Sequence, residues 1–115
     1  MRIWLDDIRN PNEWGRIGWT WTKTCDETIE LLKHNDVTSL DLDHDLAIEA
    51  TIGMPCKEKT GYDVLLWIEE QVVNNPEYVP PIMMFVHTAN PAARPRMEAA
   101  IQRIKKYIKE LHKNE

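Results

Sequence analysis

The chain lacks the features that mark secreted, membrane and zinc-finger proteins. Its 115 residues include two cysteines, Cys25 and Cys56, whose spacing and contexts fit neither a disulfide framework nor a zinc site. No apolar run approaches the roughly 20 residues needed to cross a bilayer. The first residues reach an acid at Asp6 and lack the apolar stretch of a signal peptide. We therefore expect a cytoplasmic protein with reduced thiols and no membrane partner.

A basic surface is also lacking, because 19 acidic residues outnumber 14 basic ones and give a formal net charge of -5. Proteins that coat nucleic acid need a basic surface, so the composition disfavours general nucleic-acid binding. Basic residues gather between Arg94 and Lys113, where they are typical of the solvated face of a helix and less often of a basic docking surface. The length suits a single domain, residues 1–115, with a core of its own.

Short apolar runs alternate along the chain with segments of helical periodicity. The pattern predicts strands at 2–5, 19–22, 37–42 and 82–86, and helices at about 24–34, 60–74 and from 90–95 to 111. Residues 9–18 contain Pro11 and Gly15 and predict a turn-rich connection with at most a short helix. Thr24 and Thr60 are typical N-caps for the first two helices. Strands that alternate with helices predict an α/β fold, a parallel sheet with helices on both faces.

Acids and histidines follow three of the predicted strands, at the point where each strand ends. They are Asp6, Asp7, Asp43, His44, Asp45 and His87. The carboxyl ends of strands in an open α/β sheet converge on one crevice, so these side chains are expected to share one pocket. Neighbouring carboxylates repel each other unless a proton or a cation lies between them, and Mg²⁺ prefers carboxylate, water and phosphate oxygens. We therefore expect Mg²⁺ (or Mn²⁺) to be bound by Asp6, Asp7, Asp43 and Asp45.

Several of these residues also have a simpler interpretation. Asp7 can cap the following turn or pair with Arg9. Asp41, two residues before Asp43, would be buried in the strand at a cost of several kcal/mol unless it meets a tryptophan N–H, an arginine or the metal site. Because histidine exchanges a proton near neutral pH, His44 fits either a general acid/base or a side chain that orients an aspartate.

The segment after the fourth strand is suited to an anion. The hydroxyl of Thr88 can donate to a phosphate oxygen, and the amides of Ala89 and Asn90 lie at the start of a helix, where the field is partly positive. Arg94 is within reach of the same anion, although arginines near a helix start are commonly solvent-facing. Asn90 also fits a plain N-cap.

Four motifs in order resemble a known family. They are Leu-Asp-Asp-Ile-Arg from Leu5, Leu-Asp-His-Asp-Leu from Leu42, Thr-Gly-Tyr-Asp from Thr60 and Val-His-Thr-Ala-Asn-Pro-Ala-Ala from Val86. The acidic pair, the later aspartate and the Thr-Ala pair are similar to the receiver domains of response regulators. The two histidines are not receiver features, and the whole set resembles the cyclic-phosphate-processing receiver-like family, a diverged branch. The likeness spans almost the whole chain.

The resemblance implies a receiver-like (flavodoxin-like) three-layer sandwich with about four parallel strands in the order 2-1-3-4. Ordinary receivers have a fifth strand that ends in Lys-Pro, and its lysine grips the phosphoryl group. That strand is missing here, and no Lys-Pro occurs in the sequence. The apolar run 82–86 would then lie at a sheet edge, which predicts a homodimer or a C-terminal helix folded across the edge.

Two classes of function follow. The first is Mg²⁺-dependent binding and hydrolysis of a cyclic phosphate, on a cyclic nucleotide or a cyclic-ended RNA, by a phosphoesterase with a lid at 47–59. Its catalytic residues would be His44, His87 and Asp43, and its phosphate would be bound by Thr88, Ala89, Asn90 and Arg94. The second is a signalling receiver module that accepts a phosphoryl group on Asp43. A domain that binds a cyclic phosphate without cleaving it is a third reading.

Overall fold

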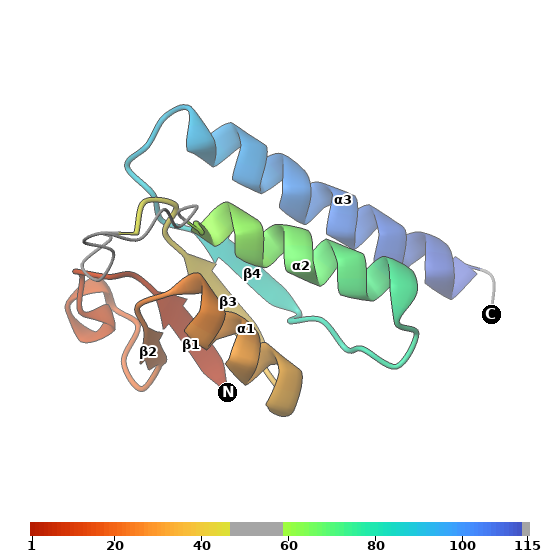
Figure 1. Ribbon diagram of the computed structural model, residues 1–115, viewed down its shortest axis with the longest axis horizontal. Coiled ribbons are helices and arrows are strands. Elements are labelled where there is room, and N and C mark those ends of the chain that lie inside the picture. Colours follow the sequence, from red (N-terminus) through yellow and green to blue (C-terminus); the bar gives the residue numbers. More distant parts are fainter. Residues whose placement is uncertain (47–58, 114–115) are drawn as a thin grey trace, which may run out of the picture.

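A four-stranded parallel sheet forms the centre of the molecule. The structure is a computed structural model that describes residues 1–46 and 59–113. Its strands lie in the order β2 (Thr20–Thr22), β1 (Arg2–Leu5), β3 (Ser39–Leu42) and β4 (Met83–Val86), each parallel to its neighbour (Figure 1). Each strand falls within its predicted range. The predicted strand order is confirmed, and β4 lies at one edge of the described sheet.

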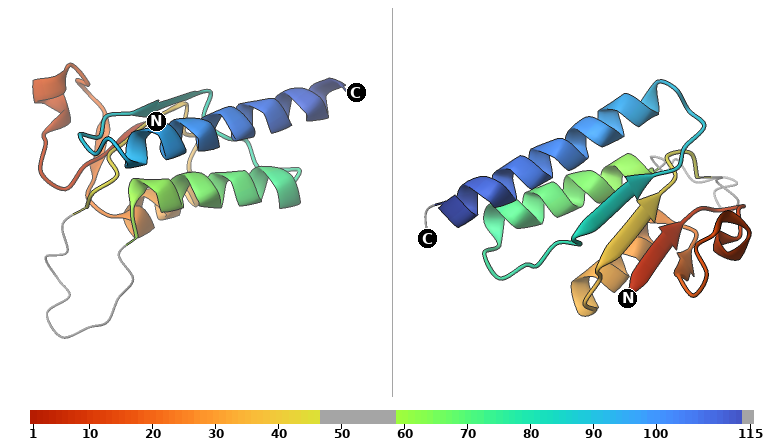
Figure 2. Two further views of the ribbon diagram at one scale, coloured as in Figure 1. Left: turned by 90° about the horizontal axis from the view of Figure 1, so that it is seen from above. Right: turned by 180° about the vertical axis from the view of Figure 1, so that it is seen from behind.

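Three α-helices lie against one face of this sheet. α1 (Cys25–His34) and α2 (Gly61–Asn74) cover the face, and α3 (Ala93–Lys113) packs along α2 and beside β4 (Figures 1 and 2). Alternate strand residues point toward these helices and join their apolar faces in the core. The fully buried members of the core are Ile3, Leu5, Leu40, Leu42, Val64, Leu65, Ile68, Met97, Ala100 and Ile104. Removal of this apolar surface from water is the main force that stabilises the fold.

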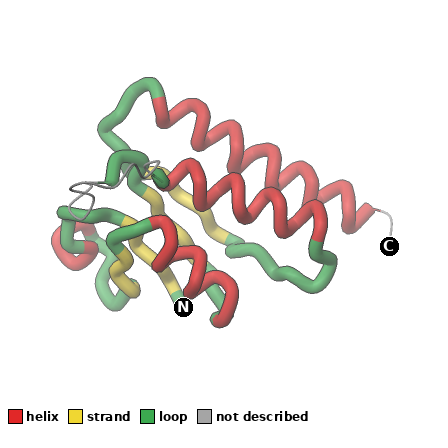
Figure 3. Tube along the Cα trace, in the orientation of Figure 1, coloured by secondary structure: helices red, strands yellow, loops and turns green. Residues whose placement is uncertain are grey.

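The opposite face of the sheet carries Trp4, Asp41 and Phe85, which are register neighbours on β1, β3 and β4. In the described part of the chain no α-helix covers this face. The segment between β1 and β2 contacts part of this face instead: Nε1 of Trp4 donates to the carbonyl of Arg9, and Arg16 pairs with Asp41. Figure 3 shows that segment mostly as loop with one short helix, η1 (Pro11–Trp14). The receiver-like α/β fold is therefore confirmed, with a third layer made of turns and not of a long helix.

Local sequence explains why this third layer is thin. Pro11 occupies the first turn of η1, where its missing N–H costs nothing. Gly15 ends η1 with a φ of 78°, a left-handed conformation that a continuing helix cannot contain. The expectation of helices on both faces is thus corrected in this respect: the weak helix predicted at 9–18 is a single 3₁₀ turn.

The N-terminus of α2 abuts the segment that follows β3. Thr60 caps α2, as predicted, in a capping box with Asp63. The amide of Gly61 donates to the carbonyl of His44 at 3.3 Å. A Cβ at Gly61 would collide with the backbone carbonyl oxygen of Asp43, so only glycine allows this close approach. The start of α2 therefore fixes the backbone of Asp43.

Some predictions fall outside what the structure covers. Residues 47–58, with Cys56 and most of the predicted lid, lie outside the described residues. Cys25 is buried in the core, where burial raises the pKa of its thiol to about 11. Across the described ranges no helix is both long and apolar enough to cross a bilayer. The homodimer remains a prediction.

We expect Gly61→Ala to lower the free energy of unfolding by about 1–3 kcal/mol, the usual cost of forcing an extra methyl group into a packed contact. The methyl group would push the start of α2 away from Asp43. Denaturant unfolding followed by circular dichroism measures the change. Glu70→Ala, at an exposed position of the same helix, is the control and should stay within about 0.5 kcal/mol of wild type. Equal stability of Gly61→Ala and wild type would contradict the close approach.

Candidate functional site

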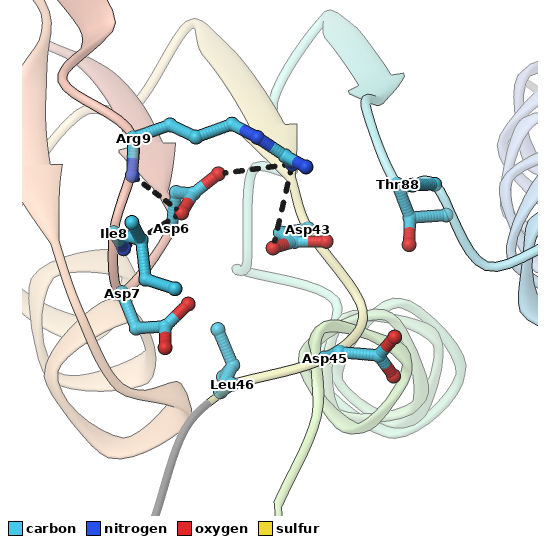
Figure 4. A pocket seen from close by; sticks show the side chains of 9 residues that line it. Asp6, Asp7, Ile8, Arg9, Asp43, Asp45, Leu46 and Thr88 are labelled. Atoms are coloured by element: carbon cyan, nitrogen blue, oxygen red, sulfur yellow. Dashed lines mark hydrogen bonds and ion pairs between the residues drawn. The ribbon is translucent and has the colours of Figure 1, made fainter. Parts of the chain in front are cut away.

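A cavity of about 380 Å³ opens at the carboxyl ends of β1, β3 and β4 (Figure 4). It is lined by Asp6, Asp7, Ile8, Arg9, Asp43, Asp45, Leu46, Thr88 and Ala89. All four predicted metal ligands and two of the four predicted phosphate-binding residues thus lie around one cavity. The convergence expected from strand ends holds because the backbone ladder continues one residue past each strand: the amides of Asp6, Asp43 and His87 each donate to the neighbouring strand at 3.0 Å.

Asp6 is buried, and its two carboxylate oxygens have different partners. Oδ1 accepts the backbone amides of Ile8 and Arg9, both at 2.8 Å, which fixes the turn after β1. Oδ2 lies 3.1 Å from Nε2 of His87 and 3.5 Å from Nη1 of Arg9. Because Oδ1 is engaged by the backbone, Oδ2 is the atom that faces the other polar side chains.

Asp43 is almost as deeply buried, with 6% of its surface exposed. Oδ1 accepts the amide of His44 at 2.8 Å. Burial raises the pKa of Asp43, and the nearby charge of Asp6 raises it further, whereas His87 and hydrogen bonds from His44 and Thr88 lower it. Two carboxylates buried together favour a positive charge between them.

Arg9 supplies such a charge. Its Nη1 lies 3.5 Å from Oδ2 of Asp6 and 3.9 Å from Oδ2 of Asp43, and Figure 4 shows the guanidinium spanning the two carboxylates. The same guanidinium lies 5.5 Å from the ring centroid of Trp14. The sequence suggested Arg9 only as one alternative partner of Asp7 and did not place it in the site. Its place in the site could have been predicted from the sequence, because Arg9 follows Asp6 by three residues and lies one turn further along the same loop.

His87 is held in one orientation by three neighbours. Its ring stacks on Trp4 with a centroid distance of 3.8 Å and an interplanar angle of 4°. Nδ1 lies 2.6 Å from Oδ1 of Asp41, and Nε2 faces Asp6. The other oxygen of Asp41 pairs with Arg16, whose Nε and Nη2 each lie at 3.0 Å. The sequence predicted a tryptophan N–H, an arginine or the metal site as the partner of a buried Asp41. The structure gives it an arginine, Arg16, together with a histidine, His87, that was not predicted.

Asp6, Asp43 and His87 together could hold a divalent cation. Each offers one ligand atom, and these atoms all lie within 4.8 Å of one another. The donor set also fits chemically, because it joins two buried carboxylates to an imidazole nitrogen. Asp7 and Asp45 line the same cavity as further oxygen donors.

The remaining predicted residues lie around this cluster without lining the cavity. Nδ1 of His44 lies 2.7 Å from Oδ1 of Asp45, and this hydrogen bond lowers the pKa of Asp45. Oδ1 of Asn90 accepts the amides of two residues that lead into α3, in the manner of an N-cap. The guanidinium of Arg94 donates to the carbonyl of Thr88 and pairs with Glu98. For His44, Asn90 and Arg94 the geometry thus matches the simpler interpretations of an orienting, a capping and a surface side chain.

In protein stripped of metal, we expect Asp43→Asn to raise the midpoint of thermal unfolding at pH 7 by a few degrees. Folding raises the pKa of Asp43, so the folded state binds a proton more tightly than the unfolded state does. Charged Asp43 therefore lowers stability above that raised pKa, and the penalty is absent once the group is protonated. Melting curves recorded in chelator at pH 7 and at about pH 4 should show the advantage of Asp43→Asn shrinking in acid.

Asp45→Asn is the matched control with the opposite sign, because the pKa of Asp45 is lowered in the folded state. Its ionised form contributes stability at neutral pH, and Asp45→Asn should gain none. A fall in the melting midpoint of Asp43→Asn at pH 7 would contradict the electrostatic account of the cluster.

Comparison with known proteins agrees with this geometry. The family model described as the cyclic-phosphate processing receiver domain matches residues 1–103. No curated protein and no solved structure matches the chain. The match covers most of the sequence, includes all four motifs and fits the observed sheet order, so the chain belongs to the family of cyclic-phosphate processing receiver domains.

Proposed function

We propose that this domain binds a cyclic phosphate together with a divalent cation in the cavity at the strand ends, and that it hydrolyses one phosphoester bond of the ring. One observation carries the proposal: the buried carboxylates of Asp6 and Asp43 share a cavity with the hydroxyl of Thr88 (Figure 4). The family to which the chain belongs supports the substrate class.

Charge explains why a cation belongs in this proposal. A cyclic phosphodiester carries one negative charge, and the carboxylates around the cavity would repel it. Asp6 and Asp43 would hold the ion, with Asp7 and Asp45 as the further oxygen donors that the sequence predicts. When bound, a divalent cation such as Mg²⁺ or Mn²⁺ would polarise the phosphoryl oxygens and activate water.

The chain's own donors would bind and orient the anion. Oγ1 of Thr88 accepts the amide of Asn90 at 3.1 Å, and its O–H, which hydrogen-bonds Asp43 in the metal-free protein, would turn to a phosphoryl oxygen once Asp43 holds the ion. The backbone of Ala89 lines the cavity beside it. A cation between the carboxylates would replace Arg9 there, so the guanidinium could turn to the phosphate, which arginine binds well through paired N–H groups. Arg9 would then do the work that the lysine of the Lys-Pro pair does in ordinary receivers.

The reaction needs only water as a co-reactant. Its oxygen adds to phosphorus, one P–O ester bond of the ring breaks, one proton of the water ends on the released oxygen, and the other stays on the phosphate or passes to solvent. The product is a phosphomonoester with a free hydroxyl. Hydrogen-bond donors that are already in position stabilise the negative charge that develops on the phosphoryl oxygens in the transition state. Each such donor typically raises the rate about 10²–10³-fold.

We expect at least one cyclic phosphate to be opened by the purified chain only when Mg²⁺ or Mn²⁺ is added after metal removal. The panel is 2′,3′- and 3′,5′-cyclic mononucleotides, cyclic dinucleotides and RNA with a 2′,3′-cyclic end, with ³¹P NMR as the readout. Thr88→Val removes one hydroxyl at constant shape and should lower kcat about 10²-fold. Thr38→Val, at an exposed threonine beside the opposite end of β3, is the matched control and should leave kcat unchanged.

The other outcomes decide against hydrolysis. Saturable binding of an unchanged cyclic phosphate would identify a binding domain. A base-labile adduct on Asp43 after incubation with a small phosphodonor and Mg²⁺, without turnover of any cyclic phosphate, would identify a phosphoryl-accepting receiver. Equal loss of kcat in both threonine variants would remove Thr88 from the site.

A further inference from the structure

We propose that Nε2 of His87 is itself a ligand of the cation in this cavity, and that the site therefore binds a first-row transition ion such as Mn²⁺ in preference to Mg²⁺. The inference rests on the metal site of the proposed function, but not on hydrolysis. It replaces the proton-transfer role that the sequence suggests for His87 with a ligand role.

The distance between His87 and Asp6 suits two ligands of one ion. Nε2 of His87 lies 3.1 Å from Oδ2 of Asp6. Two donors that bind one ion at about 2.1 Å and at right angles to each other lie about 3 Å apart. Asp43 completes the set, since its ligand atom lies within 4.8 Å of the other two. The three donors lie close enough to share one ion, which would take the place of the Arg9 guanidinium between Asp6 and Asp43.

The opposite nitrogen of the ring determines which atom faces the ion. Nδ1 lies 2.6 Å from Asp41, and an ionised carboxylate can only accept, so Nδ1 carries the proton. With a cation held by Asp6 and Asp43, Nε2 would turn its lone pair to the ion. A carboxylate behind a histidine is the usual outer partner of an imidazole that binds metal, because it fixes the tautomer and makes the free nitrogen more basic.

Asp41 is itself firmly placed, which an outer partner requires. It is 2% exposed, and two nitrogens of Arg16 hold its second oxygen at 3.0 Å. The guanidinium of Arg16 lies against the rings of Phe85 and Trp19, at 4.8 and 4.9 Å from their centroids. With Trp4 parallel to the imidazole, the ring of His87 has little freedom to turn away from the cluster.

The nitrogen donor decides the class of metal. Mg²⁺ takes oxygen ligands and keeps several waters, whereas imidazole suits transition ions, whose affinities rise from Mn²⁺ along the first row. Two carboxylates and one imidazole therefore predict a different selectivity from the four carboxylates that the sequence suggests. His87 is the residue that makes this difference.

The test uses the full chain, stripped of metal, without any phosphate ligand. Isothermal titration calorimetry with Mn²⁺ and Mg²⁺ should show Mn²⁺ binding at least tenfold more tightly. Pulsed electron paramagnetic resonance of bound Mn²⁺ should show coupling to a nitrogen nucleus. His87→Gln should abolish the nitrogen coupling and weaken Mn²⁺ binding 10- to 100-fold, with a change of less than about threefold for Mg²⁺.

Asp41→Asn and His34→Gln complete the design. Asp41→Asn keeps the shape of the outer partner, so the nitrogen coupling should persist while Mn²⁺ affinity falls about tenfold. His34, which bonds Glu30 on the surface of α1, is the matched control, and His34→Gln should match wild type in both measurements. Circular dichroism of each variant checks folding, and the wild-type nitrogen coupling tests the proposal even if His87→Gln fails to fold.

Two results would overturn the inference: bound Mn²⁺ without nitrogen coupling in wild type, or equal affinities for Mn²⁺ and Mg²⁺. Because neither measurement contains a phosphate, loss of the proposed hydrolysis leaves the inference standing. Cation-dependent hydrolysis without nitrogen coupling would remove the inference alone.

Discussion

Repulsion between the carboxylates of Asp6 and Asp43 is the constraint around which the site is arranged. Both are buried at the ends of adjacent strands, and the raised pKa of Asp43 records the cost of burying it near a second negative charge. The two residues cannot move apart without breaking the sheet, because the backbone amide of each donates to the neighbouring strand. Among the described residues, donors compensate the pair: the amides after β1, the amide of His44 and the guanidinium of Arg9.

The thin third layer of the fold supplies much of this compensation. The connection between β1 and β2 contributes Arg9 to the cavity and Arg16 to Asp41, on either side of the short helix η1. The single 3₁₀ turn lies between these two arginines, and their guanidiniums reach separate carboxylates. Pro11 and Gly15, which begin and end that turn, shape the loop that carries both arginines.

The sequence predicted the cavity from local rules, whereas the sheet order was implied by the resemblance to receiver domains. Strand ends are marked by the change from apolar to acidic residues, and parallel strands bring those ends together. Asp7, Asp45 and Thr88 reached the cavity for the same reason. Arg9, Arg16 and Trp4 were missed as site residues because their contacts depend on how a loop folds back over a sheet, which no periodicity encodes. Asp41 lay within reach of prediction, since residues two apart on a strand share a face, as Asp41 does with Asp43 and Trp4 with Asp6.

The position of the positive charge distinguishes this site from that of an ordinary receiver. The receiver lysine comes from a fifth strand, beyond the fourth, whereas the positive charge here comes from the guanidinium of Arg9 in the loop after β1. Arg9 contacts Asp6 twice: its backbone amide donates to Oδ1, and its guanidinium pairs with Oδ2. The backbone of Arg9 is therefore fixed next to the two carboxylates. A cation that entered between Asp6 and Asp43 would release the guanidinium into the same cavity in which an anion must bind. Under the proposed function, cation and phosphate would therefore favour each other's binding through Arg9, and the metal-free protein would be protected from its own buried charge by the same side chain.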